Sequence, residues 1–147
     1  MIMMFNGNVF DSDADIIAHQ VNLSGVMGCG IAKTIKEKFP EVWTEYKAYC
    51  DTGGQKLGDM VLVKTRSGIS IANMFTQDFG FGPTERRTDY MAIETAFKKL
   101  LSCTNKSIVA IPYKYGCGVA NGDWDTVLTV LSKVFDKSER VLEIWKL

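Results

Sequence analysis

Hydrophobic residues along the chain gather in short runs and in spaced patterns, and the two arrangements predict different secondary structure. Short apolar runs bounded by turn-forming residues are typical of β-strands. Such runs occupy residues 1–5, 14–21, 60–64, 69–75, 107–112 and 141–145. Arg66-Ser67-Gly68 lies between the third and fourth runs and predicts a hairpin, and Asn6-Gly7-Asn8 predicts a turn after the first run.

Apolar residues spaced three and four positions apart predict four helices, over residues 30–39, 41–50, 86–101 and 124–135. Pro40 separates the first helix from the second, because proline interrupts a helix. The last helix is strongly amphipathic. Its apolar stripe consists of Trp124, Val127, Leu128, Leu131, Val134 and Phe135.

Strands that alternate with helices predict an α/β protein, here a three-layer α/β/α sandwich whose central sheet is covered on both faces. The run at 107–112 shows little alternation, which is typical of a central strand. The hairpin makes the sheet mixed rather than all-parallel. Because no linker, repeat or low-complexity stretch interrupts the 147 residues, the sequence predicts one domain over residues 1–147.

The composition favours a protein that is neither drawn to nucleic acid nor embedded in a membrane. The chain has 17 Lys and Arg residues against 17 Asp and Glu residues, so its formal net charge is zero. The hydrophobic content of 46% is ordinary for a globular protein, no apolar run is as long as a membrane span, and the N-terminus lacks a signal-peptide pattern. We therefore expect a cytoplasmic protein that is a monomer.

Candidate metal ligands are few. The chain has one histidine, and its four cysteines, at positions 29, 50, 103 and 117, show no C-x-x-C spacing. The acidic residues are scattered, so no ligand cluster stands out. We expect reduced thiols, no metal site and no cofactor.

Two glycine-rich loops are the strongest functional signal in the chain. Asn22 ends an apolar run, and residues 25–31 then lead directly into a predicted helix. Gly116-Cys117-Gly118 follows the strand-like run at 107–112 in a similar way. Glycines let backbone N–H groups approach a phosphate closely, and a helix N-terminus favours negative charge. The two loops therefore predict a ligand with two phosphates, or with a phosphate and a sugar.

Neither loop fits the familiar phosphate-binding patterns. A P-loop that began at Gly25 would need lysine at position 31, which is Ile31. The dinucleotide fingerprint fails as well, because Lys33 and Asn121 stand where its third glycine is required.

Five blocks of sequence, in this order and spacing, match one known family. They are Gly7-Asn8-Val9-Phe10 followed by Asp15-Ile16-Ile17, then His19-Gln20-Val21-Asn22, residues 25–32, residues 71–77 and residues 112–119. In these blocks the chain resembles the macro domains, which bind ADP-ribose. The branch it is most similar to contains ADP-ribose 1″-phosphate phosphatases and glycohydrolases that act on ADP-ribosylated DNA and protein glutamate.

The resemblance implies a pose for ADP-ribose. The first loop would wrap the distal ribose and phosphates, the second would hold the diphosphate through backbone amides, and Asn22 would face the distal ribose. Asn8 stands where the family has an Asp that bonds adenine, with Val9 or Phe10 nearby. Phe79 or Phe81 would line the adenine pocket or simply pack under a loop. The implied ligand-binding residues are Asn8, Val9, Gly25, Val26, Met27, Gly28, Cys29, Gly30, Ile31, Gln77, Phe79, Gly116, Cys117, Gly118 and Val119.

Two departures from the family bear on activity. The glycohydrolases carry a catalytic lysine after the strand at 69–75, where this chain has Thr76-Gln77-Asp78. They also carry an acid shortly after the second loop, where this chain has Val119-Ala120. A glutamine neither forms a Schiff base nor carries positive charge, so the lysine mechanism is not expected here.

Three residues remain as candidates for catalysis of hydrolysis, namely His19, Asn22 and Asp78. A histidine can act as a general base near pH 7, but a lone histidine on an apolar strand is as often a core residue bonded to a neighbour. Asp78 would position a water molecule or be a plain loop residue, and Asp123 is predicted to cap the last helix. Strand alternation would turn Lys114 away from a neighbouring tyrosine, so residues 113–115 are given no role.

The resemblance implies two alternative functions. In the first, the chain hydrolyses ADP-ribose 1″-phosphate or removes an ADP-ribosyl group from a macromolecule, with water oriented by Asn22 or His19 and loop amides stabilising charge on the phosphate. In the second, it is a binding module or nucleotide sponge without catalysis, which the missing lysine and acid favour.

Overall fold

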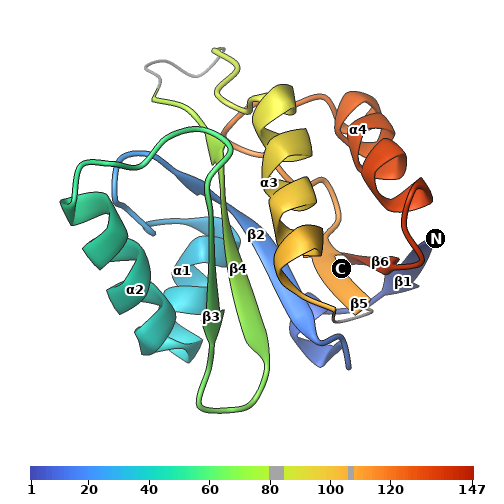
Figure 1. Cartoon of the computed structure of the whole chain (residues 1–147), viewed down its shortest axis with the longest axis horizontal. Helices are drawn as coiled ribbons and strands as arrows, with labels where there is room; N and C mark the ends of the chain where they lie inside the picture. Colours follow the sequence, from blue (N-terminus) through green and yellow to red (C-terminus); the bar gives the residue numbers. More distant parts are fainter. Residues whose placement is uncertain (80–84, 106–107) are drawn as a thin grey trace.

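In the computed structural model, which describes residues 1–79, 85–105 and 108–147, a sheet of six strands has the order β1-β6-β5-β2-β4-β3 (Figure 1). The strands are β1 (Ile2–Asn6), β2 (Ile16–Asn22), β3 (Met60–Lys64), β4 (Ser70–Gln77), β5 (Ile108–Pro112) and β6 (Val141–Lys146). Neighbouring strands run parallel except β3, which pairs with β4 in an antiparallel hairpin. The predicted mixed sheet is confirmed.

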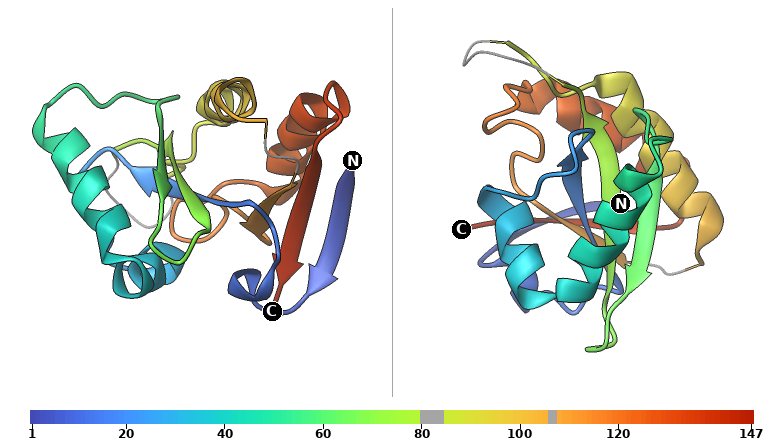
Figure 2. Two further views of the ribbon diagram at one scale, coloured as in Figure 1. Left: turned by 60° about the horizontal axis from the view of Figure 1, so that its bottom comes forward. Right: turned by 90° about the vertical axis from the view of Figure 1, so that its left-hand side faces the viewer.

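Helices cover both faces of this sheet. They are α1 (Gly30–Lys38), α2 (Pro40–Asp51), α3 (Tyr90–Cys103) and α4 (Trp124–Asp136), with a short 3₁₀ turn at Val9–Asp11. Helices α1 and α2 lie on one face, and α3 and α4 pack together on the other (Figures 1 and 2). The three-layer sandwich that the sequence predicts is therefore confirmed. Pro40 is at the start of α2, where its missing N–H costs no helical hydrogen bond.

The core is divided between the two faces of the sheet. Alternate residues of β2 show the division, since Ile16 and Ala18 join the cluster under α3 and α4, while Ile17 and Val21 join the cluster under α1 and α2. All four side chains are buried. Burial on both faces explains why the strand is a nearly continuous apolar run.

The start of α3 differs from the sequence prediction. The helix begins at Tyr90, because the Asp89 carboxylate accepts a hydrogen bond from the Ala92 N–H at 2.8 Å and caps the helix there. Arg87 and Thr88 lie before the cap and both donate their N–H to the Ala120 carbonyl. The prediction of a helix from residue 86 is wrong, and the two arginines at 86 and 87 precede the helix.

Other predicted boundaries are close to the observed ones. The strand expected at 69–75 runs from Ser70 to Gln77, and the helix expected at 124–135 runs from Trp124 to Asp136. Ser107, the predicted first residue of a strand, lies outside the described residues. Among the residues that the structure describes, no helix is long and apolar enough to cross a bilayer. The single domain, the cytoplasmic location and the monomeric state stay predictions.

Candidate functional site

A cavity of about 420 Å³ opens at the carboxyl ends of β2, β4 and β5. This edge of an open α/β sheet is where ligands commonly bind. Both glycine-rich loops contribute to its wall: the first leaves β2 and enters α1, and the second follows β5. The described wall consists of Gln20, Val21, Asn22, Val26, Gly28, Cys29, Gly30, Ile31, Ala32, Gln77, Pro112, Tyr113, Lys114, Tyr115, Gly116, Gly118, Val119 and Ala120.

Asn22 holds the first loop through both ends of its side-chain amide. Its Oδ1 accepts a hydrogen bond from the Ser24 N–H at 2.9 Å, and its Nδ2 donates to the Val26 carbonyl at 3.0 Å. Both contacts are local, so the side chain stabilises the turn by which the chain leaves β2. Asn22 therefore lies on the cavity wall with its amide already bonded within the protein.

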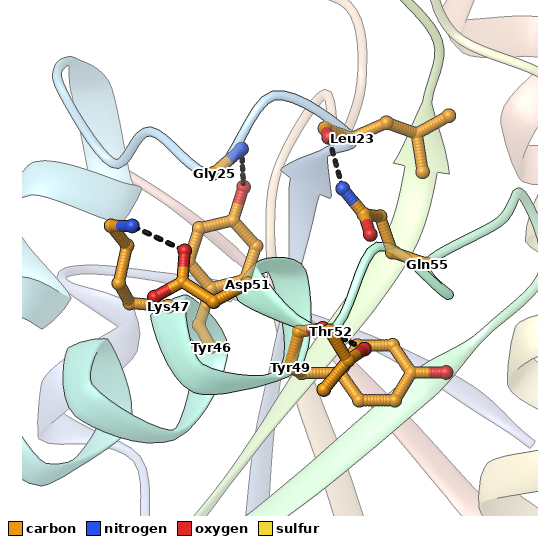
Figure 3. A network of polar contacts seen from close by, with 8 residues as sticks. All are labelled: Leu23, Gly25, Tyr46, Lys47, Tyr49, Asp51, Thr52 and Gln55. Carbon is orange, nitrogen blue, oxygen red and sulfur yellow. Dashed lines mark hydrogen bonds and ion pairs between the residues drawn. The ribbon is translucent and has the colours of Figure 1, made fainter.

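Helix α2 supports the same loop from behind (Figure 3). The Tyr46 hydroxyl lies 2.8 Å from both Asn22 Oδ1 and the Asn22 carbonyl oxygen, and it accepts from the Gly25 N–H at 3.1 Å. Beyond the helix, Gln55 donates to the Leu23 carbonyl at 3.0 Å. Burial raises the pKa of the Tyr46 hydroxyl, which therefore stays a neutral donor. These contacts attach the first loop to α2 and to the segment that follows it.

The first loop ends at the N-terminus of α1. No side chain caps this helix, since its N-cap residue Cys29 makes no side-chain hydrogen bond to the first turn. The first N–H groups of a helix have no partner inside it, and together they favour an anion. Gly30 has a φ of +59°, and a Cβ atom there would meet nothing within 4 Å. The helix therefore presents its N-terminus to open space beside the cavity.

A network of polar side chains positions the second loop. The Thr88 hydroxyl donates to the Gly116 carbonyl at 2.5 Å, and Gln20 Nε2 lies 3.2 Å from the same hydroxyl. Thr76 links the other end of Gln20 to the Tyr115 hydroxyl, at 2.8 and 2.7 Å. Gly116 has a φ of +73°, and a Cβ atom on it would lie 3.1 Å from Gln20 and Thr88. Only glycine fits there without displacing the network.

The structure brings most of the predicted loop residues together on one wall. Ten lie there, namely Asn22, Val26, Gly28, Cys29, Gly30, Ile31, Gln77, Gly116, Gly118 and Val119. Eight do not, namely Asn8, Val9, His19, Gly25, Met27, Asp78, Phe79 and Cys117. Phe81, the alternative to Phe79, lies outside the described residues.

His19 lies in the core rather than on the cavity wall. Its side chain is fully buried on β2, and Nε2 lies 2.6 Å from Asn73 Oδ1 on the neighbouring strand β4. Burial lowers the pKa of the imidazole to about 4, although the bond to Asn73 opposes the shift. Of the two interpretations that the sequence leaves open, this geometry supports the core residue.

Three other predicted residues have local partners. The Asp78 carboxylate accepts from the N–H of Phe79 at 2.7 Å, and both side chains are exposed. Asn8 Oδ1 accepts from the Phe10 N–H at 2.9 Å and caps the 3₁₀ turn. Asp123 caps α4, accepting from the Thr126 N–H at 3.0 Å, which confirms its predicted structural role.

Sequence reasoning missed several wall residues, namely Gln20, Val21, Ala32, Pro112, Tyr113, Lys114, Tyr115 and Ala120. On the described wall, Lys114 is the only residue with a formal charge, and no carboxylate or histidine is present. The described residues also contain no group of three or more potential metal ligands. A described wall with one cation and no anionic side chain is suited to an anionic ligand.

A mixed α/β/α sandwich with two glycine loops beside one cavity is an arrangement suited to a ligand that carries phosphate. The family model of the macro domain matches residues 18–131, and the chain belongs to this family.

Relatives with known names and structures agree with this assignment. The chain is 31% identical to an ADP-ribose 1″-phosphate phosphatase from Lodderomyces elongisporus, over 81% of this chain and 80% of the relative. It is 30% identical to a DNA ADP-ribosyl glycohydrolase from Mycobacterium tuberculosis. That match covers 93% of this chain but only 39% of the length of the glycohydrolase. The solved macrodomain of DarG from the same organism superimposes with a TM-score of 0.84, at 27% identity, over 99% of this chain and 97% of that one.

Proposed function

We propose that the cavity binds ADP-ribose or a derivative of it, with the diphosphate between the two glycine loops. The observation that carries the proposal is the pairing of these loops across one cavity, with the uncapped N-terminus of α1 on one side. Backbone amides and a helix N-terminus suit a diphosphate. The named relatives act on ADP-ribose derivatives, which supports the choice of this nucleotide.

In the proposed pose, the wall residues of both loops contact the phosphates and the distal ribose, and Gln77 lies near that ribose. Six further contacts stay predictions. Three of them are to the adenine, from Asn8, Val9 and Phe79, and three are within the loops, from Gly25, Met27 and Cys117. Asn22 would act mainly by shaping the first loop, since both ends of its amide are bonded there.

We further propose hydrolysis of ADP-ribose 1″-phosphate. Water would form a bond to the terminal phosphorus while the bond from phosphorus to O1″ breaks, giving inorganic phosphate and ADP-ribose. The amides at the start of α1 would stabilise charge on the phosphoryl oxygens. Support comes from the phosphatase relative, which matches this chain over four fifths of both lengths. Catalytic roles for Asn22, His19 and Asp78 stay predictions.

Binding without turnover is the second candidate. The observation that favours it is the absence of a carboxylate or histidine from the described wall of the cavity, which leaves that wall without the usual general bases. ADP-ribosylated DNA or protein would then be recognised rather than cleaved.

Calorimetric titration tests the binding proposal. ADP-ribose should bind with a dissociation constant near 1 μM, which corresponds to about −8 kcal/mol, and AMP and NAD should bind more weakly. If ADP-ribose releases no heat and gives no shift in melting temperature, the proposed ligand is wrong.

Phosphate release from ADP-ribose 1″-phosphate then separates the enzyme from the binding module. Turnover by the wild type, with Asn22→Ala, His19→Ala and Asp78→Ala assayed beside it, would show which of the three predicted residues contributes. Tight binding with no product from this substrate, or from ADP-ribosylated DNA or protein, would favour the binding module.

A further inference from the structure

Two lysines meet at one aromatic ring on the rim of the cavity. Tyr113 and Lys114 both line the cavity, directly after β5. Lys146 ends β6, the strand beside β5, and its Nζ lies 4.8 Å from the centroid of the Tyr113 ring. The Nζ of Lys114 lies 5.7 Å from the same centroid. Two ammonium groups from different elements are thus held at a single ring.

The backbone and the ring are both fixed by contacts with the fold. Tyr113 donates its N–H to the Trp145 carbonyl at 2.8 Å, and its ring packs edge-on against Trp124, with the centroids 5.1 Å apart. Lys114 has a φ of +58°, an uncommon conformation for a residue other than glycine. Its carbonyl accepts from the Cys117 N–H at 2.9 Å, which ties this conformation to the second loop.

Neither ammonium group has a carboxylate partner among the described residues, since the ion pairs found there involve other lysines. Two carboxylates on neighbouring elements have other hydrogen-bond partners. Asp123 caps α4, and Glu143 on β6 accepts from the Ser12 hydroxyl at 2.6 Å and from the Trp145 indole at 2.9 Å. Two like charges side by side, with no carboxylate ion-paired to either among the described residues, form a site that favours an anion.

We propose that Lys114 and Lys146, held at the Tyr113 ring, form a second anion subsite that binds a phosphate monoester on the ligand, in addition to the diphosphate held by the loops. This inference rests on the proposed function. The monoester has two possible positions. It is on the ribose of the adenosine, or it is on the 1″ oxygen of the distal ribose, in which case the lysines bind the terminal phosphate in place of the α1 amides. The chemistry that the lysines recognise is the same for both.

The experiment compares three ligands on the wild-type chain, namely ADP-ribose, ADP-ribose 1″-phosphate and ADP-ribose phosphorylated on its adenosine ribose. One phosphorylated ligand should bind about tenfold more tightly than ADP-ribose at low salt, as expected for new charge-assisted hydrogen bonds, and it identifies the position of the monoester. The preference should shrink as ionic strength rises, because both lysines are exposed. Intact ligand is quantified after each titration, so that hydrolysis is accounted for.

Substitutions test the two lysines directly. In Lys114→Met and in Lys146→Met, the ratio of the two dissociation constants should fall toward one, and Lys146→Arg should restore much of it. Lys133→Met, which removes an exposed lysine from the last turn of α4, is the matched control and should keep the wild-type ratio.

Failure of this inference differs from failure of the proposed function. If ADP-ribose binds but neither monoester improves binding, or if the preference survives in both methionine variants, the subsite is wrong and the loop site stands. If none of the three ligands binds, both proposals are wrong.

Discussion

The Tyr46 hydroxyl on α2 lies 2.8 Å from Asn22 Oδ1 at the end of β2, although the two residues are 24 positions apart in the chain. The same hydroxyl accepts the N–H of Gly25. One phenol thus connects a helix, a strand end and a glycine loop. The first loop therefore depends for its shape on a helix that contributes nothing to the described cavity wall.

Tyr46→Phe should loosen this loop. The substitution keeps the aromatic packing but leaves Gly25 N–H without its acceptor, so the free energy of unfolding should fall by about 1–2 kcal/mol. Affinity for ADP-ribose should fall as well. Denaturant unfolding and calorimetry measure the two effects. Tyr49→Phe is the control, since its hydroxyl bonds to Asp59 away from the loop; an equal loss of affinity there would contradict the assignment to Tyr46.

The buried imidazole should make stability depend on pH. His19 has a pKa of about 4 in the folded chain against an ordinary value of 6.5, so the unfolded chain binds more protons between these values. The neutral imidazole therefore makes its full contribution to the free energy of unfolding above pH 6.5, and this contribution is lost as the pH falls toward 4. The free energy of unfolding should drop by about 2 kcal/mol between pH 7 and pH 5.

This prediction has a direct spectroscopic check. Because the chain has a single histidine, its ring protons give one NMR titration curve, whose midpoint should lie near pH 4. The pH dependence of unfolding should weaken in His19→Gln. A midpoint near 6.5 would mean that the imidazole reaches solvent, and the core interpretation would then be wrong.

Gly118→Val should narrow the cavity without disturbing the fold. A Cβ atom on Gly118 would meet no atom within 4 Å, and its φ lies outside the left-handed region. Because Gly118 lies on the cavity wall, the added side chain should lower ADP-ribose affinity at least tenfold, or about 1.4 kcal/mol. Gly54→Val, in an exposed turn with comparable space, is the matched control and should bind like the wild type.

The cap of α3 has a clear test of its own. Asp89→Ala removes the acceptor of the Ala92 N–H, and the free energy of unfolding should fall by about 1 kcal/mol. Asp89→Asn keeps an acceptor at the same place and should retain most of the stability. Equal stability of Asp89→Ala and the wild type would contradict the assignment of Asp89 as the stabilising cap of α3.

Hydrophobic spacing was sufficient to predict the layers of the fold, because burial on two faces of the sheet leaves a strong periodic signal in strands and helices. It could not place the start of α3, since that depends on one carboxylate, Asp89, rather than on apolar residues. Strand alternation also misled the assessment of Lys114. The strand ends at Pro112, and the left-handed conformation of Lys114 turns the chain, so alternation no longer applies there.

The site was predictable where glycines mark it and hidden where polar side chains support it. The loops around Gly30 and Gly116 were found from sequence because both need glycine. Gln20 and Tyr46 gave no such signal. In the sequence, Gln20 is one residue of an apolar strand and Tyr46 one residue of an apolar helix face, and their hydrogen-bond partners lie far away in the chain. A phenol at helical spacing resembles any other buried aromatic residue until its hydrogen bonds are known.

The scarcity of charged side chains around the cavity has a practical consequence for how this protein is studied. If main-chain amides make most of the contacts to the phosphates, alanine scanning removes few of them, and a map of individual substitutions will understate the recognition surface. Hydrogen exchange is better suited than alanine scanning to detect a bound ligand, because the ligand should protect the amide hydrogens of Gly30, Ile31 and Gly118 from exchange with solvent. For the same reason, the wall can change its residue types during evolution while the nucleotide it accepts stays the same.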